Sequence, residues 1–197
     1  MDVRPSPAQQ LLGATAREFL RRRFPIEMAQ RLALDARGFD DALWRESAEL
    51  GWAGLLVPPD LGGSGGSLLD VALLVEEMGR ASLAGPYIGS AVVATSLLLA
   101  AASKDQASRL LPPLAAGDRI ATVALVEESG SFDPDAVALQ MDGAGRLTGR
   151  KLFVKDAHVA HEIGAGVLDG LVAADGAASL HAGALSLIHI SEPTRRS

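Results

Sequence analysis

Apolar side chains recur at helical spacing through the first part of the chain. In the stretch 8–23, Leu12, Ala16 and Phe19 are three or four positions apart and charged residues stand between them. This spacing places the apolar residues on one face, so it predicts an amphipathic helix. A shorter stretch at 28–34 repeats the pattern and predicts a second helix.

Two further helices have recognisable N-terminal caps. Asp40 or Asp41 can cap a third helix that ends at Gly51, because a short acidic side chain accepts hydrogen bonds from the first free amides of a helix. Ser67 is placed to cap the fourth helix. The apolar side of that helix is expected to include Leu68, Leu69, Ala72 and Leu73, with Glu76 and Glu77 nearer to solvent.

The next two stretches complete the predicted helical bundle. Residues 87–102 are apolar nearly all round, which is typical of a helix at the centre of a bundle. Residues 104–114 place Ala107, Leu110 and Leu114 on one face, and Gly117 closes the segment. We therefore predict an N-terminal helical domain over residues 1–117.

After Gly117 the pattern changes to short apolar runs broken by turn residues. These runs predict strands at 121–126, 136–141, 147–154 and 166–173, with a turn at 133–135 and a hairpin at 142–145. Helices followed by strands make an α+β fold, here an all-α bundle followed by an antiparallel β domain. The β segment, 118–184, is short for an independent barrel or sandwich, so we expect an incomplete domain.

The last residues, 185–197, differ in composition from the rest of the chain. Upstream, Ala, Leu, Gly, Arg and Val dominate, whereas this segment reads LSLIHISEPTRRS. It resembles the translation of a transposase adapter used in sequencing libraries. We expect a non-native tail here, following a gene that was interrupted after Ala184, and the alternative is an amphiphilic C-terminal strand.

Composition narrows the class of partners. The 197 residues carry a net charge of −6 and no cysteine, which argues against nucleic acid, disulfides and thiolate chemistry. The most apolar stretch, 91–102, is shorter than the about 20 residues that span a bilayer. The N-terminus has no apolar signal-peptide core. We expect a cytoplasmic protein without membrane partners.

The most informative motif is the stretch 50–67, LGWAGLLVPPDLGGSGGS. A glycine-rich loop before a helix can bind phosphate at the helix N-terminus. The dinucleotide pattern, however, needs glycine where Leu68 stands, and a P-loop needs Gly-Lys followed by Ser or Thr. Phosphate binding by this loop alone is therefore not expected.

The same stretch resembles the N-terminal domain of the acyl-CoA dehydrogenases. That family carries Leu-Gly-Trp, Val-Pro, paired glycines and a helix that ends in Glu-Glu-x-Gly-Arg, which is 76–80 here. The likeness continues through Pro86, the apolar helix and Leu110-Leu111-Pro112, and covers about 8–173. It implies FAD as cofactor, an acyl-CoA thioester as substrate, and a homo- or heterotetramer in the full-length form.

The resemblance also implies where the cofactor and the substrate bind. The family motif Ala-Leu-Thr-Glu-Pro corresponds to 124–128, and Gly-x-Lys-x-Trp-Ile-Thr-Asn corresponds to 149–156. The implied flavin contacts are Leu125, Val126, Phe153 and Lys155, and the implied substrate contacts are Ser131 and Asp133. Val126 and Lys155 stand where the family has flavin-contacting threonines, so two side-chain contacts to the flavin are lost.

No residue of the chain is assigned as catalytic. In the family, the base is a glutamate of a third, C-terminal domain, which is not expected within these residues. Glu127 and Glu128 are adjacent and point to opposite faces of a strand, so we expect solvated charges. His158 and His161, with Asp156 and Glu162 nearby, lack a third ligand at convincing spacing for a metal site and are interpreted as polar surface.

Three functions remain open at the level of sequence. The first is a truncated FAD-dependent acyl-CoA dehydrogenase that is inactive as it stands. The second is a non-catalytic partner subunit of a heteromeric dehydrogenase, favoured by Val126 and Lys155. The third is a flavin oxidase or monooxygenase on the same fold, since a fold does not determine the reaction.

Overall fold

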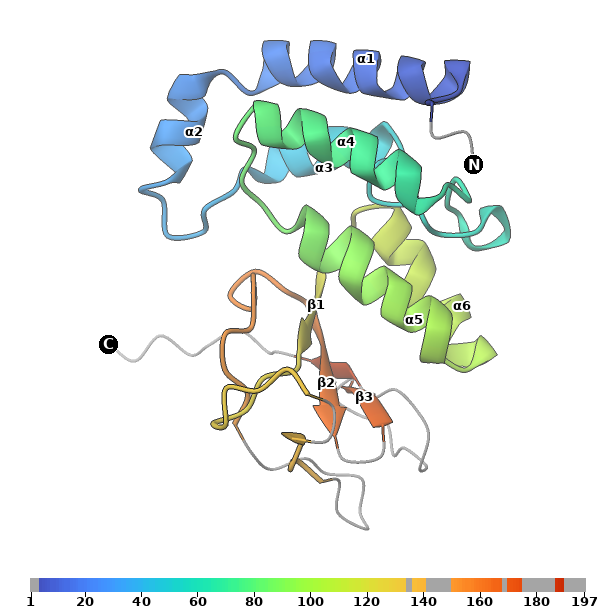
Figure 1. Cartoon of the computed structure of the whole chain (residues 1–197), viewed down its shortest axis with the longest axis vertical. Helices are drawn as coiled ribbons and strands as arrows, with labels where there is room; N and C mark the ends of the chain where they lie inside the picture. The colour runs from blue at the N-terminus through green and yellow to red at the C-terminus, as the bar shows by residue number, and fades with distance from the viewer. Residues whose placement is uncertain (1–3, 134–135, 141–149, 168–169, 175–186, 190–197) are drawn as a thin grey trace.

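The computed structural model describes residues 4–133, 136–140, 150–167, 170–174 and 187–189. The helices are α1 Pro7–Arg23, α2 Ile26–Leu32, α3 Asp41–Glu49, the 3-10 turn η1 Pro59–Leu61, α4 Leu68–Arg80, the π-helical η2 Ile88–Ala94, α5 Thr95–Ala101 and α6 Lys104–Ala115. The strands are β1 Ala121–Ala124, β2 Glu162–Val167, β3 Gly170–Ala174 and β4 Leu187–His189. Figure 1 shows the helices gathered at one end of the molecule and the sheet at the other. The predicted α+β class, with helices before strands, is confirmed.

Local sequence explains the helix starts. Ser6, Ser67 and Ser103 each accept a hydrogen bond from the backbone three residues on, and the side chain of that third residue returns a bond to the serine amide. This reciprocal arrangement satisfies two amides that lack a partner within the helix. Asp40 caps α3 through the amide of Leu43, as one of the two predicted caps.

Two apolar clusters hold the helices together. The first joins α1, α3 and α4 through residues that include Leu20, Trp44 and Leu74. At its edge, the rings of Phe19 and Trp52 meet edge-on, with their centroids 5.2 Å apart. The second cluster joins α5 and α6 to the start of the sheet and consists of Val57, Ala94, Leu98, Leu110, Leu111, Leu114, Ala115 and Ala121.

The predicted faces of α4 are wrong except at Glu76, which is exposed as expected. Leu68 and Leu69 are 67% and 43% exposed, whereas Val71, Leu74 and Met78 are buried against α1 and α3. Glu77 is also buried. Its carboxylate receives two hydrogen bonds from Arg17 of α1, at 2.8 and 2.6 Å. This partner lies 60 positions away in the sequence, so helical spacing alone could not reveal it.

The predicted helix 87–102 exists, but it is not enclosed on all sides. It runs as a π-helical segment, η2, that continues directly into α5. One face buries Ala91, Ala94 and Leu98, while Ile88 and Val93 on the other face are 42% and 44% exposed. The expectation of a central buried helix therefore holds for one face only within the described part of the chain.

The glycine-rich loop is a structural element. The amides of Ser64, Gly65 and Gly66 donate to the carbonyls of Gly54, Val57 and Leu55, at 2.9, 2.8 and 2.7 Å. These three amides are therefore used within the fold, and the absence of phosphate binding by this loop stays a prediction. A methyl group on Gly63 would lie 2.0 Å from the carbonyl oxygen of Val57, so the close approach requires glycine.

The sheet is mixed. β1 pairs with β2 in parallel, and β2 pairs with β3 and with β4 in the antiparallel sense. Two of these three strand pairs are therefore antiparallel, as predicted, whereas the pairing of β1 with β2 is parallel. β1 covers most of the strand expected at 121–126, and the strand expected at 166–173 is divided between β2 and β3.

Two predicted strands are not observed in their described parts. Residues 136–140 and 150–154 carry no strand assignment. One backbone hydrogen bond, from the amide of Leu152 to the carbonyl of Val126 at 2.7 Å, still places the second segment beside the end of β1. The rest of these strands, most of the turn at 133–135 and the hairpin at 142–145 fall outside the described residues.

The helices and the sheet meet at Gly117. The indole nitrogen of Trp44 donates to the carbonyl of Gly117 at 2.8 Å, in a buried position. Gly117 has a φ of +75°, and a methyl group there would lie 2.4 Å from Cβ of Ala48. This contact connects α3 to the chain between α6 and β1, where the sequence predicts the domain boundary.

Candidate functional site

A cavity of about 570 Å³ lies between the helices and the segment that follows residue 154. Apolar side chains from the helical part form most of its wall, including Phe39, Leu43, Trp44, Val75, Met78, Leu83 and Tyr87. Lys155, Asp156 and His158 close it from the β part. An apolar cavity with a few polar groups at its wall has the composition of a small-molecule site.

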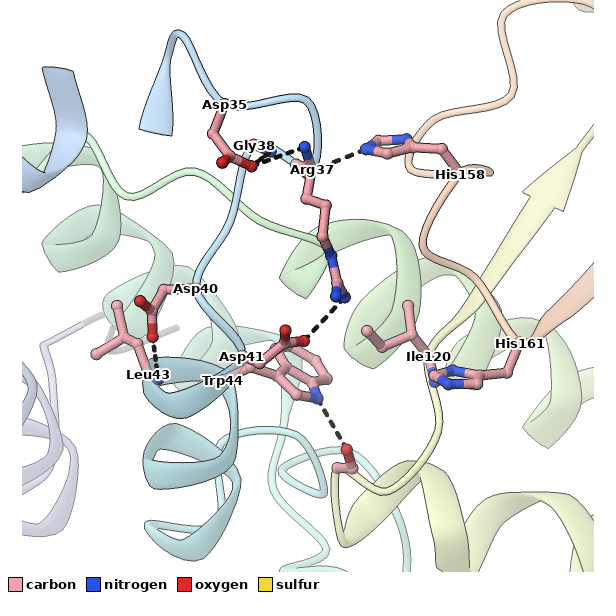
Figure 2. Close-up of polar contacts among 11 residues, drawn as sticks. Asp35, Arg37, Gly38, Asp40, Asp41, Leu43, Trp44, Ile120, His158 and His161 are labelled. Carbon is pink, nitrogen blue, oxygen red and sulfur yellow. Dashed lines mark hydrogen bonds and ion pairs between the residues drawn. The ribbon is translucent and has the colours of Figure 1, made fainter. Parts of the chain in front are cut away.

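The loop 35–41 forms one rim of the cavity (Figure 2). The carboxylate of Asp35 accepts hydrogen bonds from the amides of Arg37 and Gly38, at 2.8 and 3.3 Å. The guanidinium of Arg37 lies 5.1 Å from the centre of the Phe39 ring and bonds to Asp41 at 2.9 Å. Arg37 and Asp41 are therefore paired with each other, whereas the carboxylate of Asp35 bonds to backbone amides.

His158 and His161 contact different backbone groups. Nε2 of His158 lies 3.0 Å from the carbonyl oxygen of Arg37, which joins the two sides of the cavity (Figure 2). Nδ1 of His161 accepts from the amide of Ile120 at 3.0 Å. Among the described residues, no three His, Cys, Asp or Glu side chains lie close enough together to hold a metal ion.

Two oxygens in residues that line the cavity lack hydrogen-bond partners. They are Oη of Tyr87 and Oδ2 of Asp156, and both are buried. Loss of hydration raises the pKa of each group, and for Asp156 the nearby Lys155 and His158 oppose the rise. A methyl group on Gly89 would approach Oδ2 of Asp156 to 3.3 Å, so this oxygen lies over the first turn of η2.

Sequence analysis did not find these two groups as a site. Tyr87 is the single tyrosine of the chain and stands at the start of an apolar helix, where it is expected to contribute to the core. The sequence places Asp156 at the end of the family motif 149–156 and indicates polar surface beside His158 and His161. The two residues are 69 positions apart, so their common cavity follows from the fold.

The predicted flavin-contacting residues lie around the end of β1. Leu125 is 44% exposed, whereas Val126 is buried and its carbonyl is bonded to Leu152. Phe153 is 86% exposed and has a φ of +54°. Lys155 is exposed, lines the cavity, and its carbonyl accepts a 2.6 Å hydrogen bond from Oγ1 of Thr122.

The segment that carries Phe153 and Lys155 is thus held from both sides. Leu152 bonds to Val126, and the buried Thr122 bonds to Lys155. Phe153 and Asp156 both have positive φ, at +54° and +56°, which is unfavourable for residues other than glycine. Such backbone conformations occur at functional sites where the surrounding structure enforces them.

Glu127 and Glu128 have different surroundings. Glu127 is partly buried and accepts hydrogen bonds from Nζ of Lys151 at 2.6 Å and from the amides of Ala138 and Leu139 at 2.9 and 3.0 Å. These bonds lower the pKa of Glu127, with that of Lys151 as the largest cause. Glu127 is therefore a structural group and the expectation of a solvated charge is wrong for it, whereas Glu128 is exposed as expected.

The predicted substrate-contacting residues lie in the loop after β1. Oγ of Ser131 accepts a hydrogen bond from the amide of Asp133 at 3.0 Å, so the two residues form a local turn. Phe132 between them is 80% exposed. Neither Ser131 nor Asp133 lines the cavity.

Comparison with known proteins identifies the class. The profile described as "Acyl-CoA dehydrogenase, N-terminal domain" matches residues 6–118. The chain therefore belongs to the acyl-CoA dehydrogenase family, as its motifs suggest.

Particular relatives extend the match into the β part. The acyl-CoA dehydrogenase IpdE2 of Mycobacterium tuberculosis is 37% identical over 134 residues, which are 68% of this chain and 39% of that protein. The benzylmalonyl-CoA dehydrogenase of Aromatoleum aromaticum is 36% identical over 137 residues, 66% of this chain and 36% of that protein. The ChsE4–ChsE5 complex of M. tuberculosis superposes with a TM-score of 0.76 at 26% identity, covering 96% of this chain and 49% of that one. The chain thus spans less than half the length of these three relatives.

The family is FAD-dependent, and several solved structures with this fold contain the cofactor. They include an acyl-CoA dehydrogenase of Bacillus anthracis complexed with FAD, with a TM-score of 0.72 at 24% identity. No helix in the described part of this chain is long and apolar enough to cross a membrane.

Proposed function

We propose that the chain is the front part of a FAD-dependent acyl-CoA dehydrogenase, and that it supplies one face of the flavin site and the wall of the acyl site. The observation that carries this proposal is the position of the cavity. It opens beside Lys155, two residues after the exposed ring of Phe153, at the junction of the helices and the sheet. The acyl-CoA substrate is proposed from family membership.

The residues around β1 fit a flavin by apolar contact. Leu125 and Phe153 offer exposed side chains beside the strand end, and exposed aromatic rings favour stacking on planar ring systems. Neither Val126 nor Lys155 can offer a hydroxyl group, so a flavin here would contact backbone and apolar atoms. A flavin held beside Leu125 and Phe153 would supply the hydride-accepting chemistry of the reaction.

The protein's own part in the reaction is to position the acyl thioester. The bonds of Thr122 and Leu152 fix the 152–156 segment, and a fixed segment keeps the thioester close to the flavin edge. The apolar cavity wall excludes water around the acyl group. We assign no base within residues 1–197, and propose that the carboxylate that takes the α-proton comes from another part of the full-length enzyme. By itself, the chain would then bind an acyl-CoA thioester but would not oxidise it.

A second function, a partner subunit without catalysis, is favoured by one observation. Val126 and Lys155 replace two hydroxyl-bearing contacts, which weakens flavin binding at this site. Relatives include complexes, such as ChsE4–ChsE5 and the CarC subunit of a caffeyl-CoA reductase–Etf complex of Acetobacterium woodii. A homo- or heterotetramer and a cytoplasmic location remain proposals from the family.

The test is to purify the product of the complete gene that encodes these residues and to record its visible absorbance. The proposal predicts a yellow protein that is bleached by an acyl-CoA and needs an electron acceptor for turnover. A colourless protein that binds acyl-CoA and restores activity to a flavin-bearing subunit would assign the partner function instead. Acyl-CoA-dependent oxygen consumption without an acceptor would assign the oxidase.

A further inference from the structure

The ammonium group of Lys151 connects the two segments that carry the proposed flavin contacts. Nζ of Lys151 donates to Oε1 of Glu127 at 2.6 Å and to the carbonyl of Leu125 at 3.2 Å. Leu125 directly follows β1, and Lys151 precedes the exposed ring of Phe153 by two positions. One side chain therefore joins the end of the strand to the segment that presents the ring.

The pair of Lys151 and Glu127 is largely shielded from solvent, since the two side chains are 9% and 14% exposed. Glu127 also accepts hydrogen bonds from the amides of Ala138 and Leu139, at 2.9 and 3.0 Å. The bond from Lys151 is the largest cause of the lowered pKa of Glu127. The carboxylate is therefore held in its ionised form, and it keeps the ammonium of Lys151 at the end of the strand.

A gain in stability does not by itself explain such a pair. Removal of two opposite charges from water costs about as much as their attraction contributes, and apolar side chains of similar volume often stabilise a fold equally well. A shielded pair with directional hydrogen bonds instead favours one conformation of the groups that it contacts. Here those groups include two successive carbonyls, because Lys151 holds that of Leu125 and the amide of Leu152 holds that of Val126 at 2.7 Å.

We propose that Lys151 is a positioning residue of the flavin site, which acts by fixing the backbone of Leu125 relative to Phe153. The inference rests on the proposed function, because Leu125 and Phe153 are flavin contacts within that proposal. Phe153 has a φ of +54°, which is unfavourable and requires support from neighbouring bonds. With Lys151 in place, both apolar side chains are ordered before the cofactor binds, so less conformational freedom is lost on binding.

Arg150 and Glu128 provide a matched comparison within the same two segments. Each is the chain neighbour of one member of the shielded pair, but their side chains are 73% and 75% exposed. Their closest charged atoms are 3.5 Å apart, and a pair that is exposed to solvent in this way fixes little. Substitution of Arg150 therefore removes the same charge from the same segment without releasing Leu125.

The experiment measures the affinity of the flavin-free product of the complete gene for added FAD, from the change in flavin fluorescence. Lys151→Met should raise the Kd for FAD about tenfold, which corresponds to about 1.4 kcal/mol. Glu127→Gln leaves the bond from Lys151 to Leu125 available and should raise the Kd about threefold or less. Arg150→Met should leave the Kd unchanged.

A double variant separates positioning from a general loss of stability. Lys151→Met alone leaves the carboxylate of Glu127 without its cation, whereas Lys151→Met combined with Glu127→Gln removes both charges. The double variant should therefore melt at a higher temperature than Lys151→Met, and it should still bind FAD about tenfold more weakly than the unsubstituted protein. It also carries the test if Lys151→Met does not fold. Arg17→Met, which destabilises the helical part, should leave the Kd unchanged.

A measurement without flavin tests the fixed backbone directly. In the flavin-free protein, the amide of Leu152 should exchange with solvent deuterium about tenfold faster in the double variant than in the unsubstituted protein, because the strand end is released. Arg150→Met should not change this rate.

The outcomes separate this inference from the proposed function. Equal Kd values for the double variant and Arg150→Met, equal losses of affinity in Glu127→Gln and the double variant, or an unchanged exchange rate at Leu152 would overturn the inference. If the unsubstituted protein binds FAD and oxidises an acyl-CoA while the variants do not differ, the proposed function stands and the inference fails. An unsubstituted protein that binds no FAD overturns the proposed function, and the role of Lys151 at a flavin with it.

Discussion

Two carboxylates with buried oxygens have opposite surroundings in the described part of this chain. Glu77, in the helical part, receives two hydrogen bonds from Arg17 and has Arg80 at 3.4 Å, and these contacts lower its pKa. Asp156, at the cavity, has one buried oxygen without a partner in the described residues, and loss of hydration raises its pKa. Glu77 is buried and Asp156 is half-buried, yet only the carboxylate of Glu77 is compensated by the fold.

The difference separates a carboxylate that stabilises the structure from one that the fold leaves without a partner. A buried charge is tolerated when a partner of opposite charge and good geometry is present. The comparison predicts that changes at Glu77 and in the packing around it cost stability, whereas changes at Asp156 and Tyr87 cost little stability.

The largest loss of stability is expected in the tightly packed loop of the helical part. Gly63→Ala would force a methyl group against the carbonyl oxygen and Cβ of Val57, at 2.0 and 2.4 Å. The loop must shift, and we expect a cost of about 3 kcal/mol or more in the free energy of unfolding. Gly62→Ala is the control, because no atom lies within 4 Å of the added carbon and only the φ of +87° opposes it. Denaturant unfolding should show a loss of about 1–2 kcal/mol for the control, and equal losses would contradict the close approach.

The next effect concerns the partner of Glu77. Arg17→Met removes both hydrogen bonds and leaves a buried carboxylate beside Arg80. Because Arg17 itself is 64% exposed, we expect a loss of about 1–2 kcal/mol, less than for a fully buried pair. Arg21→Met breaks a pair with Glu18 in which both side chains are exposed, and it should cost under about 0.5 kcal/mol. Similar losses in the two variants would show that Glu77 does not depend on Arg17.

The pH dependence of stability should have opposite signs for the two carboxylates. The folded pKa of Glu77 is lowered from 4.5, so its contribution is complete above that value and is lost as the pH falls through the folded pKa. The folded pKa of Asp156 is raised from 3.8, so its contribution is complete below that value and is lost as the pH rises through the folded pKa. Urea unfolding between about pH 2 and 6, compared with Glu77→Gln and Asp156→Asn, measures both slopes. Slopes of the same sign would contradict the comparison.

The smallest change in stability is expected for Tyr87→Phe. This substitution removes a buried hydroxyl that has no partner in the described residues and keeps the ring in place. We expect stability to remain within about 0.5 kcal/mol or to rise slightly, since no hydrogen bond is lost. Thermal melts of the variant and of the unsubstituted chain, both without ligand, measure this change in stability. A loss of more than about 1 kcal/mol would show that the hydroxyl has a partner, such as an ordered water.

Much of the fold follows from local sequence. The helix starts at Ser67 and Ser103 are fixed by capping side chains three residues apart, and such signals are visible in the sequence. The orientation of α4 was not predictable from spacing, because Leu68, Leu69 and Leu73 look as suitable for a core as Val71 and Leu74 do. Tertiary contact with α1, including the bond from Arg17 to Glu77, decides between the two faces.

The β part was less predictable for a related reason. Short apolar runs indicate strands but do not identify their partners, and the parallel pairing of β1 with β2 joins residues about 40 positions apart. The residues implied as flavin contacts could be named only through the family motifs, and their role stays a prediction. The cavity could not be anticipated at all, because its walls come from the 35–47 region, the end of α4, Tyr87 and the 155–158 segment.

An NMR titration that follows the side-chain carboxyl carbons of Glu77 and Asp156 tests the comparison most directly. The account predicts a pKa below the ordinary value of 4.5 for Glu77 and above the ordinary value of 3.8 for Asp156. It also predicts that Arg17→Met raises the pKa of Glu77 and leaves that of Asp156 unchanged. Shifts of both groups in the same direction would contradict the claim that the fold compensates only Glu77.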